Sequence, residues 1–439
     1  MAKIVLIGAG SHFFARNIIT DILSYPELRD STITLVGHVH KEPVDLVASF
    51  ARKMAKEQGF NTKIESSMDR REALKGADYV LVAIRVGGGI ATTADRNIAN
   101  KYGVIESAGD TIGPLGVFFG LRNVPVIMDI CRDMQQICPD ALLINYTNPL
   151  AIIGWSVNDY TSIKNVGICN GVQGTAAELA KYVGIPKDEL SYWIGGINHM
   201  AWFLDLKWQG KDVYPLLREK FKDPAVYSAP NVNALGADIV RAEVFKAFGY
   251  YCTETSPHLS EYLPYFRKNP EMIERYKVGM MERTIPEREK MRQANEDGLR
   301  KLVGAKEALP VTRKNDYGIS IIHAVETNTA TRVTGNVKNT GLITNLLQGC
   351  CVEVPCLVDK EGLHPCYVGN LPPQLAALNR TNINVQELAV RGIANKDKTQ
   401  IFQSILLDPL TSAVLTIDET RNMVDEMFQA NAEFTKGWK

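Results

Sequence analysis

The sequence lacks any excess of charge, and this absence excludes two classes of partner. Its 439 residues carry 49 Lys and Arg against 49 Asp and Glu, which gives a formal net charge of zero. Without a basic excess the chain has no strong attraction to nucleic acid or to an anionic membrane, so we expect neither as a partner. A neutral chain also has little protection against self-association, and we therefore expect a homo-oligomer.

Long apolar runs and paired cysteines are also missing. The run near the amino terminus, Ile4–Ile7, is much shorter than the roughly 7–15 apolar residues of a secretory signal. No stretch approaches the roughly 20 apolar residues of a membrane span, so we expect a cytoplasmic protein. The eight cysteines contain no Cys-x-x-Cys pair. In that compartment they should be reduced thiols, most of them small buried side chains.

The length of the chain and the order of its predicted strands and helices indicate two domains. A chain of 439 residues is too long for one compact core. The first part alternates short β-branched runs with helical stretches, which predicts an α/β fold with a Rossmann-type, doubly wound parallel sheet. The pattern then changes to α+β. We therefore divide the chain into a Rossmann domain, residues 1–195, and a second domain for substrate binding and oligomerisation, residues 196–439.

The apolar runs also predict individual elements. Strands are expected at Lys3–Ile7, Ser31–Val36, Tyr79–Ile84, Ala141–Asn145 and Asn165–Cys169. Helices are expected at His12–Leu23, Val44–Gln58, Leu121–Met134 and Gln173–Val183. The second domain should contain a strand at Ala201–Trp208, a solvated, charged helical face at 268–306 and a last helix at Ile417–Ala430.

A glycine-rich turn, Gly8-Ala9-Gly10-Ser11, follows the first strand and opens the first helix. The first glycine permits the tight turn, and the second lets the backbone approach a pyrophosphate at the helix N-terminus. The third glycine of the usual spacing is replaced by Phe13. At this place in a strand–helix unit, the turn still favours binding of a nicotinamide dinucleotide over a purely structural role.

The end of the second strand lacks the acid that usually bonds the ribose 2′-hydroxyl of NAD. The residues that follow Val36 are Gly37, His38, Val39, His40 and Lys41. Two imidazoles and an ammonium suit the 2′-phosphate of NADP better than a free hydroxyl. A surface loop with chance histidines explains the residues equally well, so NAD and NADP both stay open.

Polar motifs follow three later strands, at Asn145–Pro149, Cys169–Val172 and Gly195–Met200. Ligands of an open α/β sheet bind outside the carboxyl ends of its strands, so the first two motifs point at one crevice. The Cys169 thiolate and the His199 imidazole could bind a borderline-soft divalent metal ion. Alone this pair is a weak signal, because a histidine beside an apolar run is more often a satisfied core residue.

Taken together, these motifs resemble glycoside hydrolase family 4. The motifs that occur in the family's order are Gly8–Ser11, Asn148-Pro149, Cys169-Asn170, Asn198-His199 and Tyr262-Leu263-Pro264-Tyr265, and the similarity runs from Lys3 to about Asp418. The NAD-dependent members are exceptions to two-carboxylate glycosidase chemistry. The resemblance implies a glycosidase with a dinucleotide, Mn²⁺ or a similar ion, a small glycoside substrate, and a homodimer or homotetramer.

The resemblance also implies a role for each matching residue. Cys169 and His199 would hold the metal ion against the 2- and 3-oxygens of the sugar. The dinucleotide would take hydride from C3, Tyr262 would remove the C2 proton, and the aglycone would leave by elimination before water adds at C1 and the hydride returns. Tyr265 stays an alternative base. The expected cofactor-binding residues are Gly8, Gly10, Ser11, His12, His38 and Asn148, and the expected substrate-binding residues are Asp110, Asn148, Asn170 and Asn198.

Asn170 and a few other positions indicate which sugar the protein acts on. Asn170 stands at a catalytic position where members acting on unphosphorylated sugars usually carry His, and an amide cannot donate a proton as an imidazolium can. The segment Thr253–Lys268 resembles the α-galactosidase branch, and 109–114 also resembles α-galacturonidases. Arg85 is typical of phospho-glycosidases, but the arginine they carry near 91–93 is missing. We expect an α-galactosidase, with an α-galacturonidase or α-glucuronidase and a 6-phospho-glycosidase as alternatives.

Two more distant classes fit part of the sequence. An Asn-Pro pair after a Rossmann strand and a downstream histidine also resemble lactate and malate dehydrogenases, which need no metal. Net NADH production from a hydroxy acid would indicate that class. A dinucleotide-binding protein without catalysis is the other alternative, because the ribose-binding acid is missing, and metal-dependent cleavage of any glycoside would exclude it.

Overall fold

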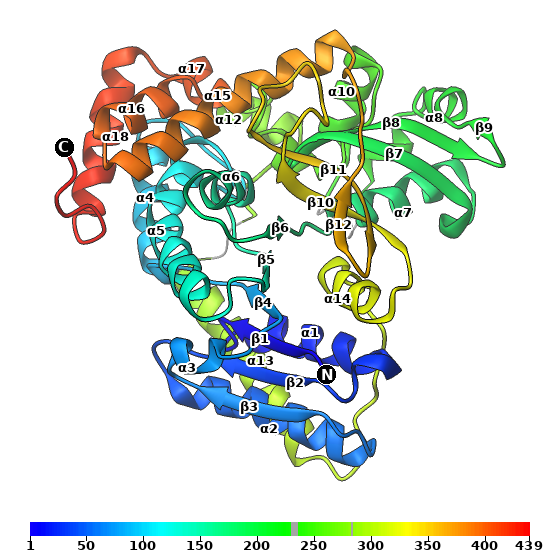
Figure 1. Ribbon diagram of the computed structural model, residues 1–439. Helices are drawn as coiled ribbons and strands as arrows, with labels where there is room; N and C mark the ends of the chain where they lie inside the picture. The colour runs from blue at the N-terminus through cyan, green and yellow to red at the C-terminus, as the bar shows by residue number, and fades with distance from the viewer. Residues whose placement is uncertain (230–235, 282–283) are drawn as a thin grey trace.

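In this computed structural model the described residues, 1–229, 236–281 and 284–439, form one continuous mixed sheet with helices packed on it (Figure 1). The strand order is β3-β2-β1-β4-β5-β6-β10-β11-β7-β8-β9, with β12 paired to β11. The predicted boundary after residue 195 falls inside β7 (Leu190–Ile197), and the sheet runs through both predicted domains. The division of the chain at that residue stays a prediction.

The parallel half of the sheet forms where the sequence has short apolar runs. Its strands are β1 (Lys3–Ile7), β2 (Thr32–Val36), β3 (Lys63–Ser67), β4 (Tyr79–Val82), β5 (Leu142–Asn145) and β6 (Asn165–Gly167). Every neighbouring pair among them is parallel. The predicted Rossmann-type fold is therefore confirmed. Strand β3 was not predicted, because its Lys-Ile-Glu-Ser-Ser sequence has a single apolar residue.

The second half of the sheet is antiparallel. Its strands are β7, β8 (Met200–Trp208), β9 (Lys211–Asp212), β10 (Thr331–Lys338), β11 (Cys351–Asp359) and β12 (Gly362–Pro365). Strand β10 pairs with the parallel edge strand β6, and β11 lies between β10 and β7. Strands from late in the sequence therefore join the Rossmann sheet to the β7–β8 hairpin.

The helices pack around this sheet. In the first part they are α1 (His12–Ser24), η1 (Pro26–Leu28), α2 (Lys41–Glu57), α3 (Arg70–Leu74), α4 (Gly88–Lys101), α5 (Gly113–Ile137), α6 (Leu150–Tyr160), α7 (Gly171–Val183) and η2 (Lys187–Glu189). Then follow α8 (Tyr214–Lys220), α9 (Ala225–Ser228), α10 (Ile239–Phe248), α11 (Ser256–Leu259), α12 (Pro270–Arg275), α13 (Ile285–Gly304) and α14 (Tyr317–Thr327). The last are α15 (Pro373–Asn395), α16 (Lys398–Leu406), α17 (Pro409–Val414) and α18 (Ile417–Ala430), which return to pack against α4 and α5.

Helix α5 corrects the expectation that no segment has the length and composition of a membrane span. By those two measures it qualifies, but 78% of its most apolar window is buried inside the protein. The apolar surface packs against α4, α6 and α15. A long apolar helix in the core of a globular protein has the same signature, so α5 is explained by packing.

The prediction that residues 268–306 form only a solvated helical face is wrong for helix α13. Its residues are mostly exposed, and a capping box between Thr284 and Glu287 fixes its start. The helix nevertheless packs against α1, α2 and α4, with Leu299 buried beneath it. It therefore lies over the first helix of the Rossmann unit, beside the glycine-rich turn.

Candidate active site

The glycine-rich turn connects β1 to α1. Gly8 adopts a φ of +94°, and the N–H groups of Gly8 and Ala9 donate to the Val36 carbonyl at 3.1 and 3.2 Å. A Cβ on Gly8 would lie 2.0 Å from the carbonyl oxygen of Ala83, so a side chain cannot be accommodated there. The turn brings bare backbone to the start of α1, where the positive end of the helix dipole favours an anion.

The two residues after Ser11 face the ligand side of this turn. His12 is buried, its Nε2 has no hydrogen-bond partner, and burial lowers its pKa. Phe13, in the place of the usual third glycine, is 58% exposed and lines the cavity described below. Its ring therefore does not enter the helix–strand contact that the third glycine normally permits. This explains how the turn forms without that glycine.

Cys169, His199 and Glu254 bring a thiol, an imidazole and a carboxylate together, with all ligand atoms within 4.8 Å of one another. The Cys169 Sγ and the His199 Nε2 lie 3.7 and 3.6 Å from the same oxygen, Glu254 Oε2. Sulfur, nitrogen and oxygen donors in one cluster suit a borderline divalent cation. Cys169 and His199 were predicted from the sequence. Glu254 was missed, although it lies in the segment Thr253–Lys268 that resembles the α-galactosidase branch, because its partner Cys169 is 85 residues away along the chain.

The electrostatics of this cluster also fit a cation. Burial, with the nearby Glu254 carboxylate, raises the pKa of the Cys169 thiol well above its ordinary value. Burial lowers the pKa of His199. Although burial acts in the opposite direction, His199 and His258 hold the pKa of Glu254 below its usual value. His199 Nδ1 is buried without a partner. A divalent cation would balance the charge of the Glu254 carboxylate, accept a lone pair from the His199 ring and stabilise the Cys169 thiolate.

A buried ionic network supports the Glu254 segment from behind. Arg241, on α10, is fully buried and donates to Glu178 Oε2 at 2.5 Å and to Thr175 Oγ1 at 2.8 Å. Thr175 in turn donates to the Thr253 carbonyl at 2.9 Å. Because Thr253 directly precedes Glu254, the network fixes the carboxylate relative to α7, whose N-terminus follows Cys169.

The polar residues of the adjoining loops approach the Cys169–His199–Glu254 cluster from the other side. Asn148 Nδ2 donates to Asp110 Oδ2 at 3.0 Å, and Asp110 Oδ1 is buried without a partner. The ring of His258 lies 4.6 Å from the ring of His199. The Tyr262 ring centroid lies 6.3 Å from that of His199, and burial raises the Tyr262 pKa well above its ordinary value. His258 lies in the same recognised segment, Thr253–Lys268, and was missed because nothing in its local sequence indicates that it faces His199.

The structure separates the two tyrosines proposed as bases. Tyr262 is 1% exposed and faces the cluster, whereas Tyr265 is 41% exposed and stacks on Phe248 at 6.5 Å. Asn170, at the start of α7, is exposed and makes no capping hydrogen bond through its side chain. His38, at the end of β2, is also exposed.

Glu261 connects the segment that carries Tyr262 to the loop that carries Asp110. Its buried Oε1 accepts hydrogen bonds from the backbone N–H groups of Ala108 at 2.6 Å and Gly109 at 3.2 Å. The loop that presents Asp110 is therefore held by the residue that precedes Tyr262. No motif in the sequence indicated this contact, because its partners lie about 150 residues apart.

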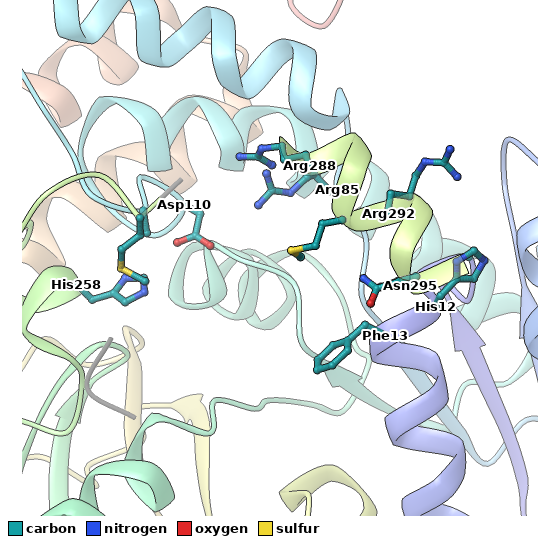
Figure 2. A pocket seen from close by; sticks show the side chains of 13 residues that line it. His12, Phe13, Arg85, Asp110, His258, Arg288, Arg292 and Asn295 are labelled. Atoms are coloured by element: carbon teal, nitrogen blue, oxygen red, sulfur yellow. The ribbon is translucent and has the colours of Figure 1, made fainter. Parts of the chain in front are cut away.

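A cavity of about 920 Å³ connects the glycine-rich turn to this polar cluster. Figure 2 shows Asp110 and His258 at one end and His12, Phe13 and Asn295 at the other. Arg85 and Arg288 lie between these two ends, and Arg292 lies at the end near Asn295 and His12. Helix α13 supplies two of these arginines together with Met291 and Asn295, so the segment predicted to be solvated forms a wall of the cavity. The volume suits a cofactor-sized ligand.

Comparison with known proteins agrees with this geometry. Residues 3–185 match the profile of the family 4 glycosyl hydrolases, and residues 194–411 match the profile of their C-terminal domain. The chain is 38% identical to an alpha-galactosidase of Bacillus subtilis (strain 168), with 100% of both chains covered. It is 35% identical to an alpha-galactosidase of Rhizobium meliloti (strain 1021), covering 98% of this chain and 89% of that one. An alpha-galacturonidase of Thermoanaerobacterium saccharolyticum is 26% identical, with 99% and 97% covered.

Solved structures share the fold over nearly the whole chain. The crystal structure of lplD from Bacillus subtilis superposes with a TM-score of 0.87 at 24% identity, covering 97% of this chain and 99% of that one. A 6-phospho-alpha-glucosidase from gut microorganisms, solved in complex with NAD and Mn²⁺, gives a TM-score of 0.81 at 19% identity, with 99% and 98% covered.

Proposed function

Because this chain belongs to family 4 of the glycosyl hydrolases, we propose that it cleaves α-galactosides with the help of a nicotinamide dinucleotide and a divalent metal ion. One observation carries the proposal. The cavity runs from Gly10 of the glycine-rich turn to His258, whose ring adjoins His199 of the Cys169–His199–Glu254 cluster. A dinucleotide and a metal-bound sugar would therefore meet in one space.

The relatives support the same sugar. Two alpha-galactosidases match this chain at 38% and 35% identity over almost its full length, whereas the alpha-galacturonidase matches at 26%. The matching family profiles span both halves of the chain, which argues against the dehydrogenase alternative. A solved structure that shares the fold holds NAD and Mn²⁺. We also propose a cytoplasmic homodimer or homotetramer, consistent with the neutral net charge.

Each residue of the site has a task in this reaction. Gly8 and Gly10 would leave room for the pyrophosphate, and Cys169, His199 and Glu254 would hold the cation. When bound, the dinucleotide would supply reversible hydride transfer with the sugar, and the cation would supply Lewis acidity to the sugar hydroxyls. Asp110, oriented by its hydrogen bond from Asn148, would accept a hydrogen bond from a sugar hydroxyl through its unpartnered Oδ1.

Tyr262 would take the C2 proton at its Oη. Burial alone keeps its phenol protonated, because its pKa is raised well above 10. Positive charge held by the neighbouring Cys169–His199–Glu254 cluster would act in the opposite direction and favour the phenolate. Exposed Tyr265 lies outside this environment. Asn170 would contact the substrate but could not protonate the departing aglycone, so substrates with good leaving groups should react best.

A second candidate is an α-galacturonidase, and the arginines of the cavity favour it. Arg85 and Arg288 line the same space as Asp110. Burial lowers the pKa of Arg288, and the positive charge of Arg85 lowers it further. An anionic group on the sugar or aglycone would relieve this repulsion. A uronic carboxylate or a sugar phosphate carries such a charge, whereas galactose does not.

The test is to assay the reduced, full-length protein with Mn²⁺ and either NAD⁺ or NADP⁺. The substrates are p-nitrophenyl α-galactoside, p-nitrophenyl α-galacturonide and a p-nitrophenyl 6-phospho-glucoside. We expect cleavage of the α-galactoside that stops on adding EDTA or removing the dinucleotide. Faster cleavage of the galacturonide would replace the first candidate by the second. Cleavage of any substrate without metal or dinucleotide would contradict the proposed chemistry.

A further inference from the structure

We infer that the dinucleotide site of this chain selects NADP(H), with its ribose 2′-phosphate, over NAD(H). The inference rests on the proposed function, because it concerns the cofactor of that site. It comes from the end of strand β2, the place where a Rossmann unit meets the ribose 2′-position. NAD-binding units bond the 2′-hydroxyl there with a carboxylate, and units that bind NADP place a cationic side chain nearby.

The residue at that place is Gly37, and packing prevents it from being an acid. A Cβ on Gly37 would lie 2.5 Å from Val44 Cγ2 and 3.0 Å from Met68 Sδ. Val44 is 1% exposed and β-branched, so its methyl group cannot rotate away freely. The start of α2 thus closes over Gly37, and no carboxylate can extend from this position toward the ribose.

The backbone places the following loop beside the cofactor. The Val36 carbonyl accepts the N–H groups of Gly8 and Ala9, so Gly37 begins one residue beyond the contact with the glycine-rich turn. A Cβ on Gly10 would have its nearest contact at Pro43, in the first turn of α2, at 3.7 Å. The loop 37–40 and the first turn of α2 therefore flank the turn on the adenosine side.

The charge of this loop suits a phosphate. His38 and His40 are exposed, and the Lys41 side chain is 66% exposed. Lys41 is paired with Asp45 at 2.5 Å, but an exposed pair of this kind stabilises by at most about 1 kcal/mol and can be exchanged for a phosphate. Glu42 is the acidic residue in the first turn of α2. A phosphate monoester carries about −1.5 to −2 charges at neutral pH and would gain charge-assisted hydrogen bonds from these donors.

Binding of the cofactor alone tests the inference without relying on catalysis. The full-length protein is titrated calorimetrically with NADP⁺ and NAD⁺, and also with 2′,5′-ADP and 5′-ADP, which lack the nicotinamide. We expect NADP⁺ to bind at least about tenfold tighter than NAD⁺, with the same order for the two fragments. The preference should shrink as salt is raised, because the contacts are exposed.

Substitutions in the loop after β2 test which residues cause the preference for NADP⁺. His38→Ala combined with Lys41→Ala should weaken NADP⁺ roughly tenfold and leave NAD⁺ within about twofold. The matched control is Lys56→Ala, which removes an exposed lysine from the other end of α2 and should change neither affinity. Gly37→Asp with Val44→Ala, which makes room for the acid, should shift the preference toward NAD⁺.

Equal or tighter binding of NAD⁺ by the wild-type protein would overturn the inference and leave the proposed glycosidase intact. A preference for NADP⁺ that survives in the double variant would overturn the assignment of that preference to His38 and Lys41, because other residues would then recognise the phosphate. If neither dinucleotide binds, the inference fails together with the cofactor dependence of the proposed function. The fragments separate these cases, since they report on the 2′-phosphate alone.

Discussion

Glu353 gives the sharpest pH prediction for this protein. Its side chain, on β11, is 2% exposed and accepts a hydrogen bond from Asn336 Nδ2 at 3.1 Å. Burial, with the Glu254 carboxylate nearby, raises the pKa of Glu353 from 4.5 to about 8. The folded protein therefore keeps a proton on this side chain at neutral pH, and the unfolded chain releases it.

The sign of the pH effect follows from this difference. Between pH 4.5 and about 8 the folded state binds more protons at Glu353 than the unfolded state. Its contribution to stability is therefore fully present below pH 4.5 and is lost as the pH rises to about 8. The slope is about 1.4 kcal/mol per pH unit, so this group alone should lower the free energy of unfolding by about 2 kcal/mol between pH 6 and pH 7.5.

The substitution Glu353→Gln should remove this slope. Glutamine has the shape of the protonated acid, keeps an oxygen to accept from Asn336, and does not titrate. The free energy of unfolding is measured by urea denaturation at pH 6 and pH 7.5, in EDTA so that no divalent cation reaches Glu254. The variant should gain about 2 kcal/mol on the wild type over this range. Glu361→Gln, at the exposed β11–β12 turn, is the matched control. Parallel pH curves for wild type and Glu353→Gln would refute the burial argument.

Five further substitutions test the active site. Tyr262→Phe should lower kcat by at least about a hundredfold, whereas Tyr265→Phe should change it by less than about twofold. Similar losses in steady-state assays of the two variants would contradict the assignment of the base. Glu254→Gln should weaken Mn²⁺ about 10–100-fold in a titration followed by electron paramagnetic resonance, and an unchanged affinity would remove Glu254 from the ligand set. Gly8→Ala would place a Cβ 2.0 Å from a backbone carbonyl and should cost more than about 2 kcal/mol in denaturant melts. Gly10→Ala, with its nearest contact at 3.7 Å, should melt like the wild type yet bind the dinucleotide weakly. Equal stability of these two glycine variants would count against the tight-turn argument.

The parallel sheet could be predicted because its strands carry strong local signals. Strand β1 spans the predicted residues, and β2, β4, β5 and β6 differ from prediction only at their ends. Strand β3 was not predicted from the sequence, because its stability comes from pairing with β2 and its own residues are mostly polar. Helix α13 was recognised as helical but not as part of the cavity wall. In the sequence its arginines resemble those of any solvated helix. Their place in the cavity wall follows from the packing of α13 on α1 and α2.

The candidate site was predictable where residues follow strands in short motifs. Asn148, Cys169 and His199 belong to such motifs, and the structure brings Cys169 and His199 into one cluster. Glu254 and Glu261 were not found, because their partners lie in segments far away in the sequence. A carboxylate that accepts two backbone N–H groups from a distant loop leaves no pattern along the chain. Such contacts depend on the tertiary fold alone.

The strand order has a consequence for how the protein is made. Strand β6, the last parallel strand, has its outer edge covered by β10, which ends at Lys338, about 170 residues later. At roughly 5–20 residues per second, a ribosome needs about 10–35 s to synthesise that stretch. During this time the nascent Rossmann half presents an open hydrogen-bonding edge, which is a template for pairing with another chain. A fragment that stops before Thr331 would keep that edge permanently, so expression of the amino-terminal half alone should favour aggregation over a stable domain.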